Sequence, residues 1–192
     1  MHQDEVTRTG LNRRSFIGFG AVAAAAALSP LRAQAAPPVK KAPVRSLSFF
    51  NTHTGERLKT TYCCDGKYEP EALKQINHIL RDWRVDKVKP IDPKLLDLLH
   101  ELSGTLETDS PYHIISGYRS PVTNATLRTK GGAHTGVASK SLHLVGKAID
   151  IRVPGVRLDH LRGAARSLKL GGVGFYPSSN FVHVDTGRVR FW

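Results

Sequence analysis

The sequence predicts a single α+β domain with a mainly antiparallel sheet. Helical patterns precede and interrupt a set of short strands, and strand and helix do not alternate in the regular way that builds a parallel sheet. The length of 192 residues agrees with this prediction, because it is enough for one domain of ordinary size plus a targeting segment. The sequence has no internal repeat.

Local patterns define each expected element. Alternating apolar residues between turn residues predict strands, and apolar residues three or four positions apart predict helices. The glycine-rich segment 131–136 fits neither pattern and is expected to be a flexible loop. The expected order is two hairpin strands at 44–50 and 56–62, helices at 69–83 and 92–104, a strand at 112–116, a short helix from Pro121, a strand at 147–153, a helix at 158–170, and strands at 172–176 and 181–185.

The first 35 residues predict export from the cytoplasm. The pair Arg13 and Arg14 precedes a weakly apolar run at 16–28, which ends near the small-residue segment Ala-Gln-Ala at 33–35. This order is typical of a cleavable secretory signal and is too short for a stable membrane anchor. The arginine pair resembles a twin-arginine signal, and an ordinary secretory signal or an uncleaved anchor is the alternative. We therefore expect a signal peptide at 1–35, a linker at 36–44, a domain at 45–192 and a periplasmic location.

The charge of the chain narrows the class of partner. The formal net charge is +12, and loss of residues 1–35 would leave +10. Nucleic acid is not the expected partner, because the protein is exported and has no basic stripe studded with aromatic residues. No segment after the signal is long and apolar enough to span a membrane. Peptidoglycan, whose stem peptides carry free carboxylates, is the expected acidic polymer.

Cys63 and Cys64 are adjacent in the chain. Neighbouring cysteines close a disulfide only through a distorted peptide link, and these two lack the spacing of a zinc knuckle. We expect structural thiols on a strand, one pointing inward and one outward. A redox or intermolecular role is the alternative.

Three residues predict a metal site. His143 and Asp150 are seven positions apart, so they cannot point to the same side of one regular strand. They can converge if His143 lies on a loop and Gly146 allows the chain to turn before the strand that carries Asp150. His183, on the final expected strand, offers a further nitrogen ligand. Two imidazoles and one carboxylate would hold one Zn²⁺ per chain and leave its fourth position open, as in catalytic zinc sites.

Four motifs follow one another in the last part of the chain. They are Gly-Tyr-Arg-Ser-Pro at 117–121, Ser-x-His-x-x-Gly-x-Ala-x-Asp at 141–150, Gly-Gly-Val-Gly-Phe-Tyr-Pro at 171–177 and Phe-Val-His-Val-Asp at 181–185. With these motifs the chain from residue 117 to residue 192 resembles the M15 metallopeptidases of peptidoglycan, and among them the murein endopeptidase K group. The resemblance implies a zinc peptidase with the compact α+β fold shared by D-Ala-D-Ala peptidases and hedgehog-type domains.

The resemblance also places Arg119 at the substrate. An arginine there would stabilise the negative charge that develops on the scissile carbonyl oxygen. The alternative is that Arg119 pairs with a carboxylate and holds its own loop.

The general base is the point at which the chain departs from the family pattern. Many members carry an acid three residues before the last metal histidine or a histidine two before it, and here these positions are Asn180 and Phe181. We expect Asp185 to be the base, because residues two apart on a strand face the same side as each other. The alternative is that Asp185 orients a histidine ligand. His134, on the glycine-rich loop, is a further candidate for the base.

The expected function is therefore a zinc-dependent murein endopeptidase that hydrolyses peptide cross-links during remodelling of the cell wall. Two alternatives remain. The first is a D,D-carboxypeptidase or dipeptidase of the same family, which would trim a D-Ala terminus. The second is a zinc-containing module that binds the wall without catalysis.

Overall fold

The computed structural model describes residues 44–130 and 137–192. The expected signal peptide, all of the linker except Val44, and the loop that carries His134 lie outside the described residues. Within the described residues, no helix has the length and apolar character needed to cross a bilayer.

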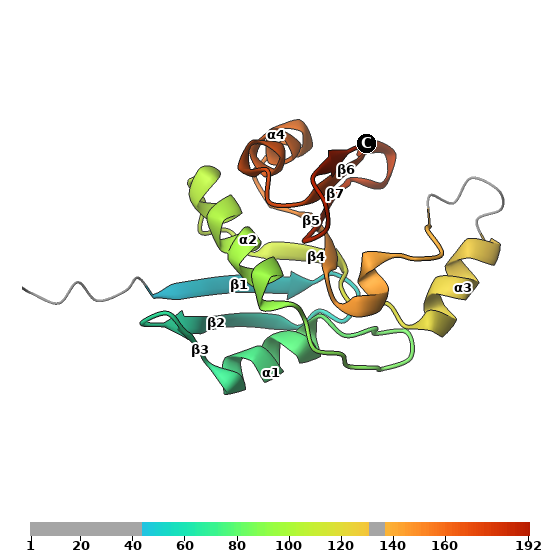
Figure 1. Ribbon diagram of the computed structural model, residues 1–192, viewed down its shortest axis with the longest axis horizontal. Coiled ribbons are helices and arrows are strands. Elements are labelled where there is room, and N and C mark those ends of the chain that lie inside the picture. The colour runs from blue at the N-terminus through green and yellow to red at the C-terminus, as the bar shows by residue number, and fades with distance from the viewer. Residues whose placement is uncertain (1–43, 131–136) are drawn as a thin grey trace, which may run out of the picture. The chain divides into compact units, whose positions relative to one another are not determined.

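The described residues form one sheet with helices packed on it (Figure 1). Its strand order is β3-β2-β1-β4-β5-β7-β6-β8. The strands are β1 (Arg45–Asn51), β2 (Arg57–Cys64), β3 (Lys67–Tyr68), β4 (Tyr112–Ser116), β5 (Ala148–Arg152), β6 (Gly172–Tyr176), β7 (Phe181–Asp185) and β8 (Arg190–Phe191). The helices are α1 (Pro70–Ile79), α2 (Pro93–Thr105), α3 (Pro121–Lys130) and α4 (Leu158–Leu168), with short 3₁₀ helices η2 (Leu142–Val145) and η3 (Pro177–Ser179).

The α+β class is confirmed, but the prediction of a mainly antiparallel sheet is wrong, because the sheet is mixed. Strand β1 pairs in parallel with β4, and β6 pairs in parallel with β8. The other described pairings are antiparallel. The parallel pair β1–β4 follows from the chain's path: α1 and α2 separate the first hairpin from β4, and a connection of that length lets a strand return in the same direction.

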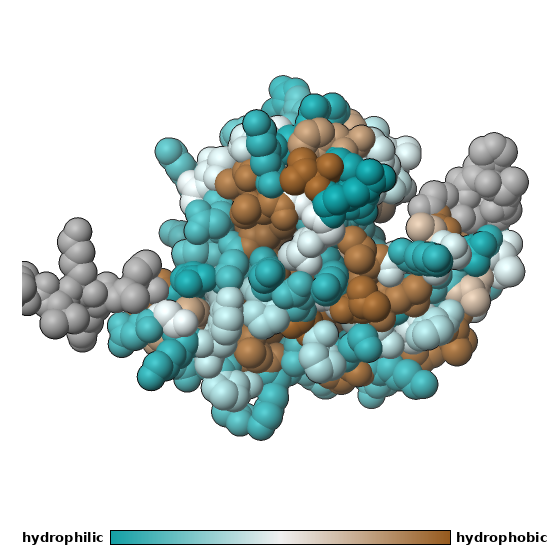
Figure 2. Space-filling view, viewed as in Figure 1, coloured by the Kyte–Doolittle hydropathy of each residue, from teal (hydrophilic) through white to brown (hydrophobic). Residues whose placement is uncertain are grey.

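The core lies between the sheet and three helices: α1 contacts β2, α2 contacts β1, and α4 contacts β6, β7 and α2 (Figure 1). Helix α2 buries leucines on successive turns against the apolar face of the sheet. In the space-filling view, polar residues cover most of the visible face and leave only smaller apolar patches (Figure 2). On strand β2, Cys63 is buried and Cys64 is half-buried, and both are free thiols.

Alternation along β5 and β7 gives the sheet two different faces. Ile149 and Ile151 of β5 and Val182 and Val184 of β7 belong to the core. Successive residues of a strand point to opposite sides, so the residues between them face away from this core. The ligands expected on these strands are therefore brought to one face of the sheet.

Gly146 makes the turn that joins η2 to β5. Its φ of +67° lies in the left-handed region, where glycine carries no steric penalty. Its carbonyl accepts a hydrogen bond from the backbone N–H of Asp92 at 2.9 Å. A Cβ at this position would lie 2.4 Å from the carbonyl oxygen of Pro90. Only glycine fits this contact, which fixes where η2 lies beside the sheet.

Candidate metal centre

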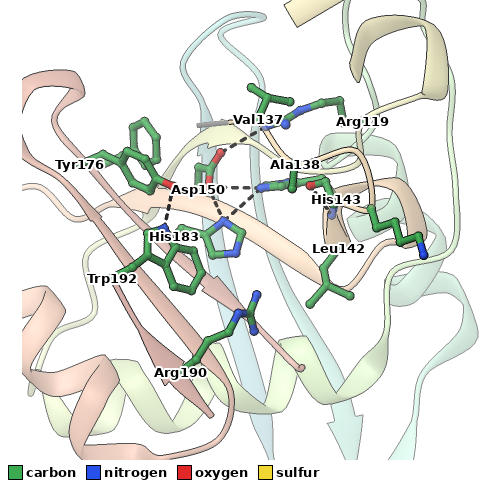
Figure 3. Close-up of a pocket in the computed structure, with 13 residues that line it drawn as sticks. Arg119, Val137, Ala138, Leu142, His143, Asp150, Tyr176, His183, Arg190 and Trp192 are labelled. Atoms are coloured by element: carbon green, nitrogen blue, oxygen red, sulfur yellow. Dashed lines mark hydrogen bonds and ion pairs between the residues drawn. The ribbon is translucent and has the colours of Figure 1, made fainter. Parts of the chain in front are cut away.

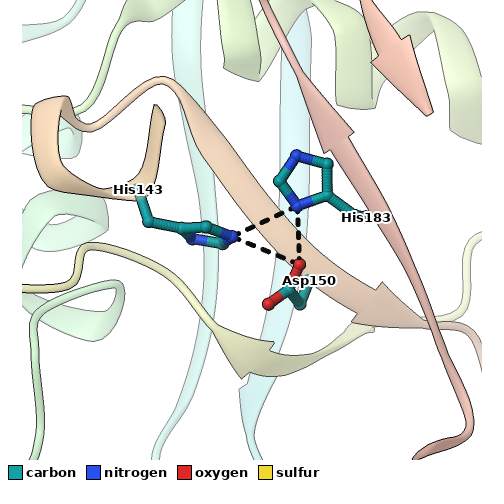
Figure 4. Close-up of side chains that lie close together, drawn as sticks. All are labelled: His143, Asp150 and His183. Atoms are coloured by element: carbon teal, nitrogen blue, oxygen red, sulfur yellow. Dashed lines mark hydrogen bonds and ion pairs between the residues drawn. The ribbon is translucent and has the colours of Figure 1, made fainter. Parts of the chain in front are cut away.

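The three residues singled out as metal ligands lie together and are buried (Figure 4). Asp150 of β5 and His183 of β7 are directly opposite each other in the antiparallel pair. Their facing atoms, Asp150 Oδ1 and His183 Nδ1, are 2.8 Å apart. His143 approaches from η2 and places its Nε2 at 3.2 Å from each of these two atoms. One oxygen and two nitrogens thus converge on one point.

A backbone carbonyl sets the orientation of the His143 ring. Nδ1 of His143 is 2.7 Å from the carbonyl oxygen of Gly117. A carbonyl can only accept, so Nδ1 carries the proton and donates it. In a neutral imidazole this leaves Nε2 unprotonated, with its lone pair directed at the other two ligands. His143 is therefore held in the tautomer that binds a metal ion through Nε2.

His183 lies between two carboxylates. Its Nδ1 faces Asp150, and its Nε2 is 3.0 Å from Oδ2 of Asp185. Burial by itself would lower the pKa of His183, but the two carboxylates outweigh burial and raise the pKa to about 9. Burial would likewise raise the pKa of Asp150, whereas the His143 and His183 rings hold it well below its ordinary value. In the absence of a metal ion, a proton on His183 compensates the buried negative charges.

The donor set fits a metal ion. The three ligand atoms lie within 4.8 Å of one another. They line a cavity of about 160 Å³, so one side of the cluster faces an opening. Two imidazoles and one carboxylate with an open side are the donors that catalytic zinc sites use, whereas structural zinc sites are closed by a fourth protein ligand.

Asp185 is fully buried behind His183, on the side of the ring away from the other ligands. Its Oδ1 accepts hydrogen bonds from the backbone N–H groups of Gly172 at 3.2 Å and Gly187 at 2.8 Å. Arg190 donates to both carboxylate oxygens, at 3.1 and 2.7 Å. Burial would raise the pKa of Asp185, but hydrogen bonds from His183 and Arg190 lower it far below its usual range.

This environment does not fit the role of general base that the sequence predicts for Asp185. A base must reach the proton that it takes, directly or through one water molecule. Asp185 has no exposed surface, and its oxygens are already occupied by donors. The strand alternation that motivated the prediction does put Asp185 on the side of His183, but the histidine ring stands between Asp185 and the cavity.

Arg119 lies in the loop between β4 and α3 and lines the cavity (Figure 3). It is buried, and its Nη2 is 3.6 Å from Oδ2 of Asp150. Its other contacts, to Ser116 Oγ at 3.4 Å and Asn124 Oδ1 at 3.5 Å, are also long. Within the described part of the chain its Nε has no hydrogen-bond partner. A buried guanidinium with such long contacts keeps donor capacity for a ligand in the cavity.

The loop that carries Arg119 is held by Asp82, which sequence reasoning missed. The buried Asp82 carboxylate accepts the backbone N–H of Ser120 at 2.8 Å and that of Arg84 at 3.2 Å. The apolar spacing predicted a helix through Trp83 and so hid this role, but the helix ends at Ile79. The useful signal was an acidic residue near the C-terminal end of a helical pattern. Unpaired backbone carbonyls disfavour a carboxylate there, so its hydrogen-bond donors have to come from outside the helix.

Further residues of the cavity wall come from the last third of the chain (Figure 3). They include two cations, Lys140 and Arg190, and three aromatic residues, Tyr176, Phe181 and Trp192. Local sequence patterns do not indicate that these residues meet. The three aromatic residues and Arg190 come together only when β6, β7 and β8 pair.

Comparison with known proteins agrees with this geometry. Residues 39–192 match the M15 family described as peptidoglycan L,D-endopeptidase MepK. The peptidoglycan L,D-endopeptidase MepK of Escherichia coli K12 is 45% identical over 181 residues, which cover 94% of this chain and 97% of the relative. The probable peptidoglycan L,D-endopeptidase MepK of Haemophilus influenzae is 38% identical over 182 residues, or 94% and 95% of the two chains. The chain therefore belongs to the M15 peptidase family, in its murein endopeptidase K group.

Proposed function

We propose that this protein is a zinc-dependent endopeptidase that hydrolyses peptide cross-links of peptidoglycan. The observation that carries the proposal is the convergence of His143, Asp150 and His183 at a cavity that also holds the Arg119 guanidinium. The relatives are named L,D-endopeptidases, which supports a scissile bond between an L- and a D-centre. Remodelling of the cell wall is the process that such an activity would serve.

Each residue of the centre has a distinct proposed role. His143, Asp150 and His183 hold the metal ion. When bound, zinc would lower the pKa of a water molecule and polarise the scissile carbonyl. Arg119 places positive charge where the carbonyl oxygen becomes negative. The Arg119 contact with Asp150 is long enough to leave donors for that oxygen.

Asp185 is proposed as a positioning residue in place of the base. By accepting a hydrogen bond from Nε2 of His183, it would fix the ring with Nδ1 towards the metal ion. Among the described residues that line the cavity, Asp150 is the one carboxylate, and it is assigned to the metal. His134, on the loop outside the described residues, remains the candidate base from the sequence.

The endopeptidase is favoured over the two alternatives. A wall-binding module without catalysis has no need for a ligand set with one open side and a guanidinium beside it. A carboxypeptidase needs a cation that binds the terminal carboxylate of its substrate. Arg190 lines the cavity but is already paired with Asp185, so Lys140 is the cation that such an enzyme would use. The names of the relatives, L,D-endopeptidases, favour the endopeptidase over the carboxypeptidase. The fold shared with D-Ala-D-Ala peptidases and hedgehog-type domains remains part of the proposal.

The location is proposed to be periplasmic, with residues 1–35 as a twin-arginine signal, 36–44 as a linker and 45–192 as the peptidase domain. The support is the order of arginine pair, weakly apolar run and small-residue site.

Changing Arg13 and Arg14 to lysine should leave the precursor in the cytoplasm. Fractionation measures this directly, and normal periplasmic appearance of the variant would reject a twin-arginine signal.

Loss of any metal ligand should remove both zinc and activity. His143→Ala, Asp150→Ala and His183→Ala each leave two protein ligands, which is too few for a stable zinc site. Elemental analysis of the purified variants and digestion of sacculi measure the two effects. His160→Ala, at an exposed position on α4, is the matched control and should keep both. Full zinc occupancy in Asp150→Ala would remove Asp150 from the ligand set.

Asp185→Asn should weaken metal binding by about 10- to 100-fold, because a neutral amide no longer fixes and polarises the His183 ring. Competition with a chelator measures the affinity. Asp159→Asn, the same change at an exposed pair with Arg157, is the control and should have no effect. If Asp185 were the base, the variant would keep wild-type zinc affinity and lose turnover together with one limb of its pH–rate profile.

The zinc-loaded protein should convert cross-linked muropeptide dimers to monomers. Chromatography with mass spectrometry of digested sacculi identifies the products. Activity should fall as salt rises, because the basic protein attracts an acidic polymer and salt screens exposed charges. Loss of terminal alanine with dimers untouched would support a carboxypeptidase, and the absence of any product would support a binding module.

A further inference from the structure

In the hairpin of β6 and β7, the residue opposite His183 has no side chain. In the antiparallel pair β6–β7, Gly174 is directly opposite His183, as Tyr176 is opposite Phe181. Residues opposite each other project from the same face of a sheet. A side chain at position 174 would therefore stand beside the His183 ring, and glycine leaves this space free.

The indole of Trp192 fills the space. Strand β8 pairs in parallel with β6. The pairing continues to Trp192, whose backbone N–H donates to the Val173 carbonyl at 3.2 Å and whose carbonyl accepts from Phe175 at 3.0 Å. A Cβ at Gly174 would lie 2.6 Å from Cε2 of the indole. The ring thus lies directly over Gly174, in a place that any larger residue would take.

Several contacts hold this indole in place (Figure 3). Its Nε1–H donates a hydrogen bond to the Tyr176 hydroxyl at 2.8 Å. The Arg190 guanidinium lies 4.8 Å from the ring centroid, and the His183 ring centroid is 5.3 Å away. Yet 49% of Trp192 remains exposed, and the residue lines the cavity. Packing of the core does not account for a large apolar ring that is fixed on several sides and open on the side of the cavity.

We propose that Trp192, held over Gly174, is a wall of the substrate cleft that contacts aliphatic side chains of the stem peptide, such as the methyl group of alanine, next to the scissile bond. The proposal rests on the proposed function. A rigid, partly exposed aromatic ring binds aliphatic groups at little cost in conformational entropy. Its position beside His183 puts this contact within one residue of the metal centre.

A role of Trp192 in holding the metal ligand is less consistent with the contacts. Both nitrogens of His183 already have carboxylate partners, Asp150 and Asp185. The ring orientation therefore does not depend on Trp192. Removal of the indole should change the binding of substrate and leave the binding of zinc intact.

The test compares Trp192→Ala with Trp192→Phe in the zinc-loaded protein, with a cross-linked muropeptide dimer as substrate. For Trp192→Ala we expect KM to rise by about tenfold, with kcat within about threefold and stoichiometric zinc. Trp192→Phe keeps an aromatic face and loses only the hydrogen bond to Tyr176, so it should recover most of the loss. An unchanged KM, or a loss of zinc affinity without a change in KM, would overturn the proposal.

Gly174→Ala tests the arrangement independently. The new methyl group collides with the indole, so KM should rise in the wild-type background. In the Trp192→Ala background the collision is absent, so the same change should have little further effect. This non-additivity is the signature of two groups that act together. Additive effects on KM would contradict the proposal that Gly174 makes room for the indole of Trp192.

A binding measurement separates this proposal from the proposed hydrolysis. The chain has two tryptophans, and Trp83 is not among the residues that line the cavity. Trp83→Phe leaves Trp192 as the sole reporter, and its fluorescence should change and saturate as the dimer is added to metal-free protein, with no turnover required. A saturating signal without cleavage by the zinc-loaded protein would reject the proposed hydrolysis alone. Binding by calorimetry without a change in emission would reject Trp192 as the contact, and absence of binding would reject both.

Discussion

The site depends on the register between β5 and β7. With Asp150 opposite His183, the aliphatic residues on either side of them, such as Ile149 and Val184, all face the core. A slip of one residue would turn every side chain of a strand to the other face and would bury an ionisable ligand among leucines. The same apolar packing that stabilises the domain therefore holds two ligands on one side of the sheet, without any loop to position them.

The third ligand and its supports come from backbone geometry outside these two strands. Gly146 turns the chain so that η2 returns over the sheet, and the carbonyl of Gly117 then fixes the His143 ring. Gly117 lies so close to the end of α1 that a Cβ there would be 2.4 Å from the carbonyl oxygen of Leu80. Asp185, which Arg190 holds, orients the His183 ring, as the Gly117 carbonyl orients the His143 ring. Each imidazole is thus oriented by a partner on its far side.

Local patterns predicted much of this arrangement. The element order follows from the period of apolar residues and from turn residues, and the three converging residues follow from motifs that resemble those of the M15 family. The rest depends on contacts between separate elements, which a local pattern of residues does not contain. The parallel pairing of β1 with β4, the end of α1 at Ile79 and the place of Trp192 over Gly174 are all set by tertiary packing. For Asp185, strand alternation gave the correct side of the sheet but could not show that Arg190 occupies the carboxylate.

The proposed metal centre is tested most directly by the coordination of zinc in the purified protein. X-ray absorption at the zinc edge reports the type and distance of the coordinating atoms. We expect two nitrogen neighbours at about 2.0–2.1 Å from His143 and His183, and oxygen neighbours at about 2.0–2.2 Å, one of them from Asp150. Sulfur scattering at about 2.3 Å, which would place Cys63 or Cys64 at the metal, or a single imidazole would contradict it.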